Sequence, residues 1–192
     1  MNKNRLEAFS DGVLAIIITI MVLELKIPDG TNFEALLQLF PIFVSYILSF
    51  IYVGIYWNNH HHMMHTVKKV TGGILWANLH LLFWLSLIPF ATAWIGEHHF
   101  APFPMLFYGF ILLMCGIAYN ILQKQIIKTQ GENSLLAKAI GKDIKGKISP
   151  ILYLIAILST YYHEVFSGII YILVALMWLI PDKRIEKILD NE

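Results

Sequence analysis

Six long stretches without Asp, Glu, Lys or Arg dominate this 192-residue chain and restrict how it can fold. A helix needs about 20 consecutive apolar residues to cross the hydrocarbon core of a bilayer. With 57% hydrophobic and 14% charged residues, a chain of this length has more apolar surface than its own core can bury. The sequence therefore predicts an all-α, polytopic membrane protein. The uncharged stretches cover residues 12–23, 35–65, 70–96, 98–123, 148–163 and 165–181.

We expect one domain, residues 1–192, that consists of six transmembrane helices. Basic residues concentrate on the cytoplasmic side of membrane proteins. With six spans and a cytoplasmic N-terminus, 13 of the 14 Lys and Arg residues fall on the inner side, and only Lys26 falls outside. Both termini are therefore predicted to be cytoplasmic. The approximate helices are 5–27, 33–62, 69–96, 101–128, 147–162 and 165–181.

The first predicted helix is unusual because its uncharged part is short. Only twelve residues separate Asp11 from Glu24, a length of about 18 Å along a helix. That length cannot keep both carboxylates out of hydrocarbon, although every residue between them is apolar, small or a threonine. Ionisable groups inside membranes usually face a cavity or the interior of a bundle. We therefore expect this helix to stand at the centre of an oligomer, with water-filled vestibules at both ends.

One face of this helix carries a regular stripe. Ile16, Thr19, Ile20 and Leu23 follow the spacing i, i+3, i+4, i+7. Around a symmetry axis, they would form stacked aliphatic rings with a ring of hydroxyl groups between them, and aliphatic rings can close an ion path by dewetting. The alternative is an ordinary packing stripe within one chain.

Two polar motifs accompany the first three predicted helices. The first is Arg5-x-x-x-Phe9-Ser10-Asp11; Ser10 or Asp11 could instead be a helix cap. The second is a run of histidines after Trp57, together with Asn78 in the third helix. His61 and His65 have the i, i+4 spacing of a zinc pair, but the Glu of a His-Glu-x-x-His site is missing. We expect hydrogen bonding at a helix junction instead, with the outer histidines solvated, and a bond between Asp11 and Asn78 is sterically reasonable.

Together these motifs resemble the bacterial branch of the lysosomal potassium channel family, transmembrane protein 175. The Arg5, Phe9, Ser10, Asp11 opening matches the hallmark of that family. Trp57-x-x-His60-His61, Asn78 and the sequence Pro-Phe-x-Thr at 89–92 resemble it as well. The layout agrees over six helices, whereas the motifs fall mainly in the first three.

The resemblance implies specific roles. The first helix would line the pore of a homotetramer, and Ile16 would be the hydrophobic constriction. Ile20 and Leu23 would continue the pore-lining face of this helix, and Thr19 matches a pore hydroxyl. Arg5, Ser10 and Asp11 hold this helix against the next two, with His60, His61 and Asn78 as partners. Ala15 replaces a serine of the animal members, which leaves the preference for potassium over sodium open.

We therefore expect a passive, potassium-selective channel that leaks other monovalent cations and lies in the plasma membrane of a prokaryote. It is predicted not to be an enzyme. It should need no cofactor besides permeant potassium near Ile16 and Thr19, and it should bind no metal tightly. Its expected partners are its own copies and lipid, with no nucleic acid or nucleotide. Acidic residues at the outer mouth would concentrate cations; they are Glu24, Asp29 and Glu34. The alternatives are a proton-coupled secondary transporter that uses Asp11 and His61 as a relay, and a histidine-dependent metalloenzyme.

Overall fold

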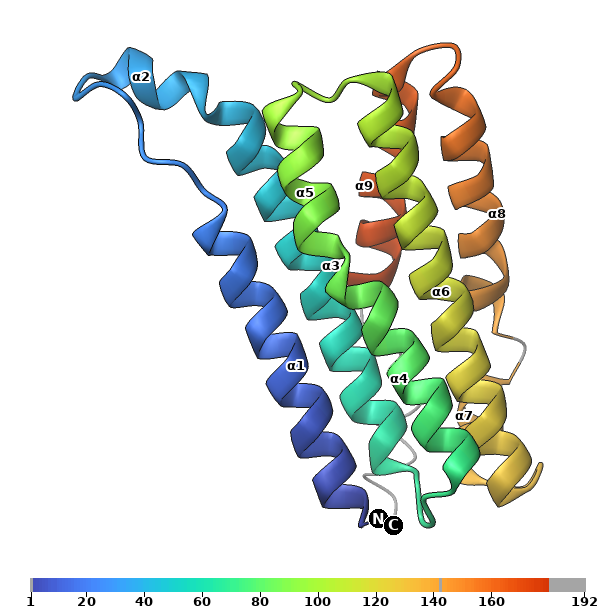
Figure 1. Ribbon diagram of the computed structural model, residues 1–192. Helices are drawn as coiled ribbons and strands as arrows, with labels where there is room; N and C mark the ends of the chain where they lie inside the picture. The colour runs from blue at the N-terminus through green and yellow to red at the C-terminus, as the bar shows by residue number, and fades with distance from the viewer. Residues whose placement is uncertain (1, 142, 180–192) are drawn as a thin grey trace.

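The computed structural model describes residues 2–141 and 143–179, and this part of the chain consists of helices joined by loops, without strands (Figure 1). The all-α prediction is therefore confirmed for the described residues. The helices are α1 (Lys3–Leu23), α2 (Phe33–Gln38), α3 (Phe40–His65), α4 (Gly72–Ser86), α5 (Ile88–Glu97), α6 (Pro102–Gln130), α7 (Leu135–Ile140), α8 (Ile144–Ser159) and α9 (Glu164–Leu179).

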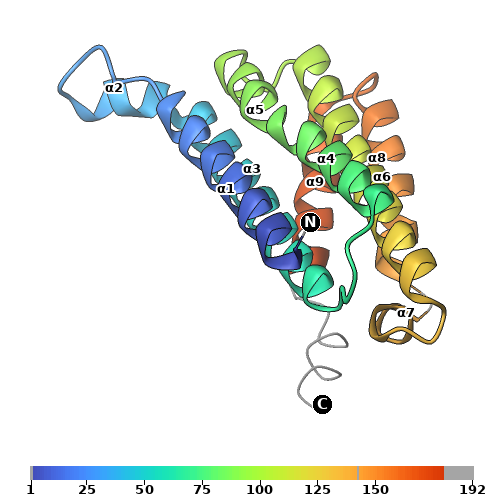
Figure 2. The same cartoon turned by 60° about the horizontal axis from the view of Figure 1, so that its bottom comes forward.

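The long helices stand side by side in a bundle, with α1 along one edge and α8 on the opposite side (Figure 1). The helix α1 packs mainly on α3, α4 and α5, whereas α6 packs on α4, α5, α8 and α9. The N-terminus and the segments that follow α3 and α6 lie at one end of the bundle, and α2 lies at the other. Figure 2 shows α7 at the end of α6, far from α1. An edge position leaves one side of α1 without a neighbour from its own chain.

Four helical segments of the described chain have the length and hydropathy to cross a membrane. They include α1, α3 and α6, and α4 continues into α5 as a fourth segment of 26 residues. The helix α9 is also apolar, but both α8 and α9 have only 16 residues. The chain is therefore a membrane protein by length and composition.

Prolines set several helix ends that differ from the predicted ends. The helix α1 stops at Leu23, four residues before the predicted end at 27, and Ile27 precedes Pro28. A residue before proline is disfavoured in the helical region, so the helix cannot continue through this position. The predicted helix 33–62 is divided at Leu39, because Pro41 lies in the first turn of α3. Residues 180 and 181 of the last predicted helix lie outside the described residues.

The third predicted helix, 69–96, bends rather than stops. Pro89 lies in the first turn of α5, and Leu87 separates α4 from α5. Proline lacks the amide hydrogen that would continue the ladder of hydrogen bonds. Beyond this bend, Gly96 allows α5 to approach α3 closely, because a Cβ atom there would lie 2.9 Å from the Cα of Ile42. Small residues of this kind allow helix backbones in membranes to approach.

Candidate functional site

The helix α1 has two distinct faces. One face is fully buried against α3, α4 and α5, and its members recur every three or four residues: Leu6, Ser10, Leu14, Ile17 and Met21. The opposite face is exposed although it is largely apolar, with Ile16 at 59% and Leu23 at 80% exposure. A helix of a single chain that exposes such a face needs lipid or another protein chain beside it.

The predicted stripe lies on this exposed side. Ile16, Thr19, Ile20 and Leu23 are all exposed in the single chain or nearly so. The Thr19 hydroxyl donates to the Ile16 carbonyl oxygen at 2.8 Å. A hydroxyl has one hydrogen and two lone pairs, so the Thr19 oxygen keeps its acceptor capacity for a group on the open side. The stripe therefore combines aliphatic surface with an oxygen that can face a cation.

The buried face of α1 is held by a hydrogen-bonded chain across three helices, which we call the α1 anchor: Ser10 of α1, Asn78 of α4 and His60 of α3. Asn78 Nδ2 donates to Ser10 Oγ at 2.9 Å, and Asn78 Oδ1 lies 2.7 Å from His60 Nε2. Ser10 and Asn78 are 0% exposed, and His60 is 2% exposed. Polar side chains commonly link helices in membranes through such bonds.

The geometry of the α1 anchor fixes the position of each hydrogen. Ser10 Oγ donates its only hydrogen to the Leu6 carbonyl oxygen at 2.9 Å, so toward Asn78 it can only accept. The Asn78 nitrogen must therefore face Ser10, and its oxygen must face His60. Because that oxygen can only accept, His60 Nε2 carries a hydrogen and donates it. Each polar atom along this contact has a partner.

Asp11 takes a different partner from the one we expected. The Trp57 indole Nε1 of α3 donates to Asp11 Oδ1 at 3.1 Å, and the polar partner of Asn78 in α1 is Ser10. Successive residues of a helix point in different directions, so only one of Ser10 and Asp11 can face α4. The interpretation of Ser10 or Asp11 as a helix cap is wrong, because α1 begins at Lys3 and its cap is Asn2.

The other residues of the signature lie at the open surface. Arg5 and Phe9 are exposed, and Arg5 forms no ion pair or side-chain hydrogen bond within the described chain. His61 stacks on Trp57 at 6.2 Å between ring centroids and does not join the α1 anchor. Lys3, which the sequence reasoning missed, donates through Nζ to the His65 carbonyl oxygen at 2.8 Å. A long amphipathic side chain at the start of a helix was the available signal.

The histidine run is surface-exposed at its outer members. The rings of His61 and His65 lie 4.5 Å apart between centroids, as their i, i+4 spacing requires. Within residues 2–141 and 143–179, no group of three or more His, Cys, Asp or Glu side chains is arranged to hold a metal ion.

Acidic residues surround the opposite end of α1. Glu24, Asp29 and Glu34 lie at this end, and Glu34 accepts a hydrogen bond from Asn32 at 3.3 Å. Lys26 forms an ion pair with Glu97 of α5 at 2.7 Å. The hydrogen bond and the charge of Glu97 raise the pKa of Lys26 above its ordinary value, and Glu24 and Asp29 act in the same direction. This end is therefore acidic, with one lysine partly compensating the charge.

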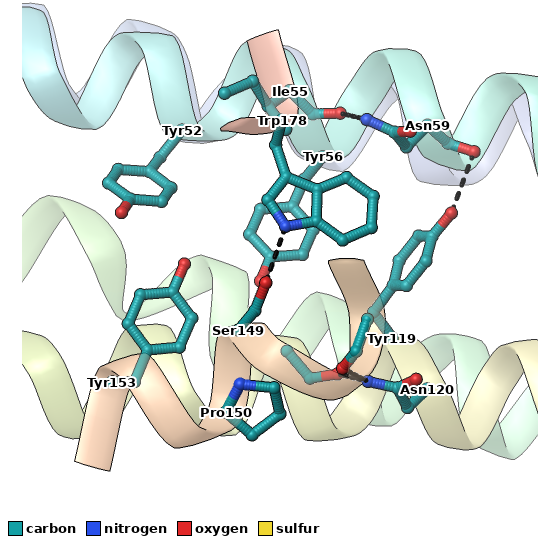
Figure 3. Close-up of a pocket in the computed structure, with 12 residues that line it drawn as sticks. Tyr52, Ile55, Tyr56, Asn59, Tyr119, Asn120, Ser149, Pro150, Tyr153 and Trp178 are labelled. Carbon is teal, nitrogen blue, oxygen red and sulfur yellow. Dashed lines mark hydrogen bonds between the residues drawn. The ribbon is translucent and has the colours of Figure 1, made fainter. Parts of the chain in front are cut away.

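A second region that contains polar side chains, which we call the tyrosine cavity, lies between α3, α6, α8 and α9 (Figure 3). It encloses about 40 Å³, enough for a few water molecules. Its wall is mainly aromatic and amide side chains from these four helices, including Tyr52, Tyr56, Asn59, Tyr119, Asn120, Ser149, Tyr153 and Trp178. Sequence reasoning missed this region, although two tyrosines four residues apart in the otherwise apolar α3 were a usable signal.

Some hydrogen bonds in the tyrosine cavity satisfy carbonyl oxygens of the surrounding helices. Pro150 inside α8 leaves the Gly146 carbonyl oxygen without its helical partner, and Asn120 Nδ2 lies 3.5 Å from this oxygen. Tyr52 donates to the Tyr171 carbonyl oxygen at 2.6 Å. The Asn120 side-chain oxygen accepts no hydrogen bond from the described residues, so it is available to water. The cavity therefore has mainly apolar walls with a few polar atoms, and it has room for water.

Comparisons with family models, with named relatives and with solved structures all find proteins described as ion channels. The family model described as endosomal/lysosomal potassium channel TMEM175 matches residues 5–89, which include the whole α1 anchor. A protein named potassium channel from Chryseobacterium sp. (strain P1-3) is 61% identical over 191 residues, covering 100% of both chains. The crystal structure of a lysosomal potassium-selective channel TMEM175 homolog from Chamaesiphon minutus is similar, with a TM-score of 0.82, 30% identity, and coverage of 94% of this chain and 97% of that chain. The human protein, named endosomal/lysosomal proton channel TMEM175, is 34% identical over 103 residues, which cover 47% of this chain and 20% of its own length.

Proposed function

The chain belongs to the TMEM175 family, and on this premise we propose that it is one subunit of a potassium channel whose pore is lined by α1 of each copy. The single observation that carries the proposal is the contrast between the two faces of α1. One face is anchored through buried Ser10, and the other exposes Ile16, Ile20 and Leu23. The matched family model includes α1, and each copy of the chain supplies one α1, so an enclosed pore lined by α1 requires several copies around an axis.

Conduction would be passive and controlled by wetting. A ring of Ile16 side chains makes a dry constriction, and a small rotation or separation of the α1 helices would admit water. The free acceptor on Thr19 would replace part of the hydration shell of a potassium ion, since its hydrogen is already committed to Ile16. Glu24, Asp29 and Glu34 would raise the cation concentration at the outer mouth, an effect that salt weakens.

Potassium flux into liposomes tests the constriction. We expect Ile16→Ala and Ile16→Asn to raise flux several-fold over the wild-type protein, because the first widens and the second wets the ring. Ile172 of α9 is a matched control, since it is an isoleucine with 48% exposure on a helix remote from α1. Ile172→Ala should leave flux unchanged. If the Ile16 variants behave like the Ile172 variant, Ile16 is not the constriction.

The alternative is proton-linked transport, which the name of the human relative makes worth testing. In a relay, a proton would pass between Asp11 and His61, but the Trp57 side chain bonds to the first and stacks on the second. A coupled transporter predicts potassium flux that saturates and follows an imposed proton gradient. A channel predicts flux that follows the potassium gradient whether or not a proton gradient is present.

Several finer features belong to the same proposal: six membrane spans with α8 and α9 as the last two, cytoplasmic termini, a homotetramer and a prokaryotic plasma membrane. We further propose that the chain is not an enzyme and needs no cofactor or tightly bound metal besides permeant potassium. The charge asymmetry of the sequence supports the orientation. An image of the purified assembly that resolves its symmetry tests the oligomer, and a peripheral location of α1 would contradict the pore.

A further inference from the structure

A recess of about 460 Å³ lies at the end of the bundle that carries the N-terminus, outside the channel machinery described above. Two segments far apart in the sequence form it. One follows α3, and the other runs from the last turn of α6 to α7. The lining residues are Thr66, Lys68, Lys69, Thr129, Gln130, Asn133, Ser134, Leu135 and Lys138.

The recess is strongly cationic. Lys68, Lys69 and Lys138 line it, and none of them forms an ion pair with the side chains of residues 2–141 and 143–179. No carboxylate is among the lining residues; Glu132 lies in the same segment but is exposed and outside the wall. Three uncompensated ammonium groups around one concave surface repel each other and favour an anion between them.

A hydrogen bond through Gln130 joins the two segments that form the recess. Gln130 Oε1 accepts from the backbone amide of Lys68 at 3.1 Å, which fixes the orientation of the Gln130 amide. The Nε2 atom on the other side is buried and has no hydrogen-bond partner in the described structure. Because this nitrogen is shielded from solvent, Gln130 contributes to the recess through its bond to Lys68, which joins the two segments.

The hydroxyl groups of the recess differ in what they can offer. Thr66 and Thr129 donate their hydrogens to helix carbonyl oxygens, at 2.7 Å and 2.8 Å. Ser134 Oγ instead accepts from the amide of Ala137 at 3.4 Å, so its hydrogen remains available. The recess therefore presents ammonium and hydroxyl donors together, which suit the oxygens of a phosphate group.

We propose that this recess binds a phosphate group and thereby ties the segment after α3 to the segment before α7. The chemistry suits a phosphomonoester headgroup of a lipid or a soluble phosphate, and basic pockets at the cytoplasmic end of membrane helices bind anionic headgroups in this way. The proposal does not depend on ion conduction, so a failed flux experiment leaves it standing.

Thermal unfolding of the purified full-length protein in an uncharged detergent tests the proposal. Three probes are compared in separate titrations: short-chain phosphatidic acid, inorganic phosphate, and short-chain phosphatidylcholine as the zwitterionic control. We expect phosphatidic acid or phosphate to raise the unfolding temperature saturably, and phosphatidylcholine not to do so. Saturation by inorganic phosphate identifies the phosphate group alone as sufficient, and saturation by phosphatidic acid alone identifies a lipid headgroup.

Variants separate a built site from general attraction to a basic surface. Lys138 lines the recess, and Lys138→Gln should weaken binding about five-fold. Gln130→Glu keeps an acceptor for Lys68 but places a negative charge in the wall of the recess, so it should abolish saturable binding. Lys124→Gln removes the same charge as Lys138→Gln from an exposed position outside the recess and should leave binding unchanged.

Two results would overturn the proposal. One is the absence of saturable stabilisation of the wild-type protein by either anionic probe. The other is equal weakening by Lys124→Gln and Lys138→Gln, with Gln130→Glu still binding, because that pattern describes diffuse attraction. Unfolding temperatures of the variants without any probe verify that each one folds.

Discussion

The α1 anchor and the tyrosine cavity both bury polar side chains inside a bundle of apolar helices, but they satisfy them differently. In the α1 anchor, Ser10, Asn78 and His60 bond directly to one another, and none of the three lines the tyrosine cavity. In the tyrosine cavity, some polar atoms bond to helix carbonyl oxygens and others face a space that can hold water. The matched family model covers the first region, whereas α6, α8 and α9, which form most of the second, lie beyond residue 89.

This difference predicts how each region responds to the loss of a partner. Where no water can enter, removal of one polar group leaves another buried group without a partner, at a cost of about 1–3 kcal/mol. Where there is room for water, a water molecule can replace the lost group. Removal of a polar side chain should therefore lower the free energy of unfolding more in the α1 anchor than in the tyrosine cavity. Four substitutions test this contrast.

The largest effect is expected for Asn78→Ala. This change removes both bonds of the α1 anchor and leaves the donor on His60 without an acceptor, so the free energy of unfolding should fall by about 3 kcal/mol. Asn120→Ala is the matched control in the tyrosine cavity and should lower it by about 1 kcal/mol, because water can reach the Gly116 and Gly146 carbonyl oxygens beside the cavity. Chemical denaturation in detergent measures both. Equal losses would remove the contrast between the regions.

Tyr52→Phe should have an intermediate effect. The Tyr52 hydroxyl donates to the Tyr171 carbonyl oxygen at 2.6 Å, and this oxygen lies inside α9, where the helical ladder supplies a second donor. Losing one such bond lowers the free energy of unfolding by about 1 kcal/mol. The same denaturation experiment measures the change. A loss as large as that of Asn78→Ala would mean that the tyrosine cavity is dry around Tyr52.

Tyr56→Phe should have a smaller effect than Tyr52→Phe, one turn earlier on the same face of α3. The Tyr56 side chain lines the cavity, so its hydroxyl can bond to water there. Its removal should change the free energy of unfolding by about 0.5 kcal/mol or less. The pair of tyrosines thus compares a protein partner with a water partner within one helix. A larger loss for Tyr56→Phe than for Tyr52→Phe would reverse this interpretation.

The smallest effect is expected for Lys26→Gln, outside both regions. Glu97 raises the pKa of Lys26, so this contact stabilises the folded state below the ordinary pKa of 10.5 and is lost as the pH rises through the raised pKa. The two side chains are 62% and 38% exposed, so water and salt screen the attraction. At low salt and neutral pH, we expect a slightly lower unfolding temperature for the variant, and no difference well above pH 10.5. A difference that persists there would exclude the ion pair as its cause.

The sequence was most informative for features that depend on the spacing of residues within one helix. Apolar runs predicted the long helices, and spacing placed Ile16, Thr19, Ile20 and Leu23 on a common side of α1, which is the exposed side of the chain. The charges at Asp11 and Glu24 set this helix apart from the other apolar runs, because they leave so short an uncharged segment between them. Each of these inferences needed only the period and the rise of a helix.

Features that depend on how distant segments meet could not be predicted. The choice of Ser10 rather than Asp11 as the partner of Asn78 depends on the rotation of α1 about its axis, which spacing along α1 does not define. The tyrosine cavity needs the relative depth of four helices. The orientation of the Gln130 side-chain amide depends on its hydrogen bond with the backbone of Lys68, 62 residues away in the sequence.

The level at which α1 is fastened has a mechanical consequence. Its polar contacts with α3 and α4 lie at Lys3, Ser10 and Asp11, and from there to Leu23 only apolar contacts hold it against the other helices. The helix α1 can then tilt about Ser10. Along the helix axis, Ile16 lies about 9 Å and Leu23 about 20 Å from Ser10. A tilt of about 10° would shift Ile16 sideways by about 1.5 Å and Leu23 by about 3.5 Å, so Leu23 would move more than twice as far as Ile16.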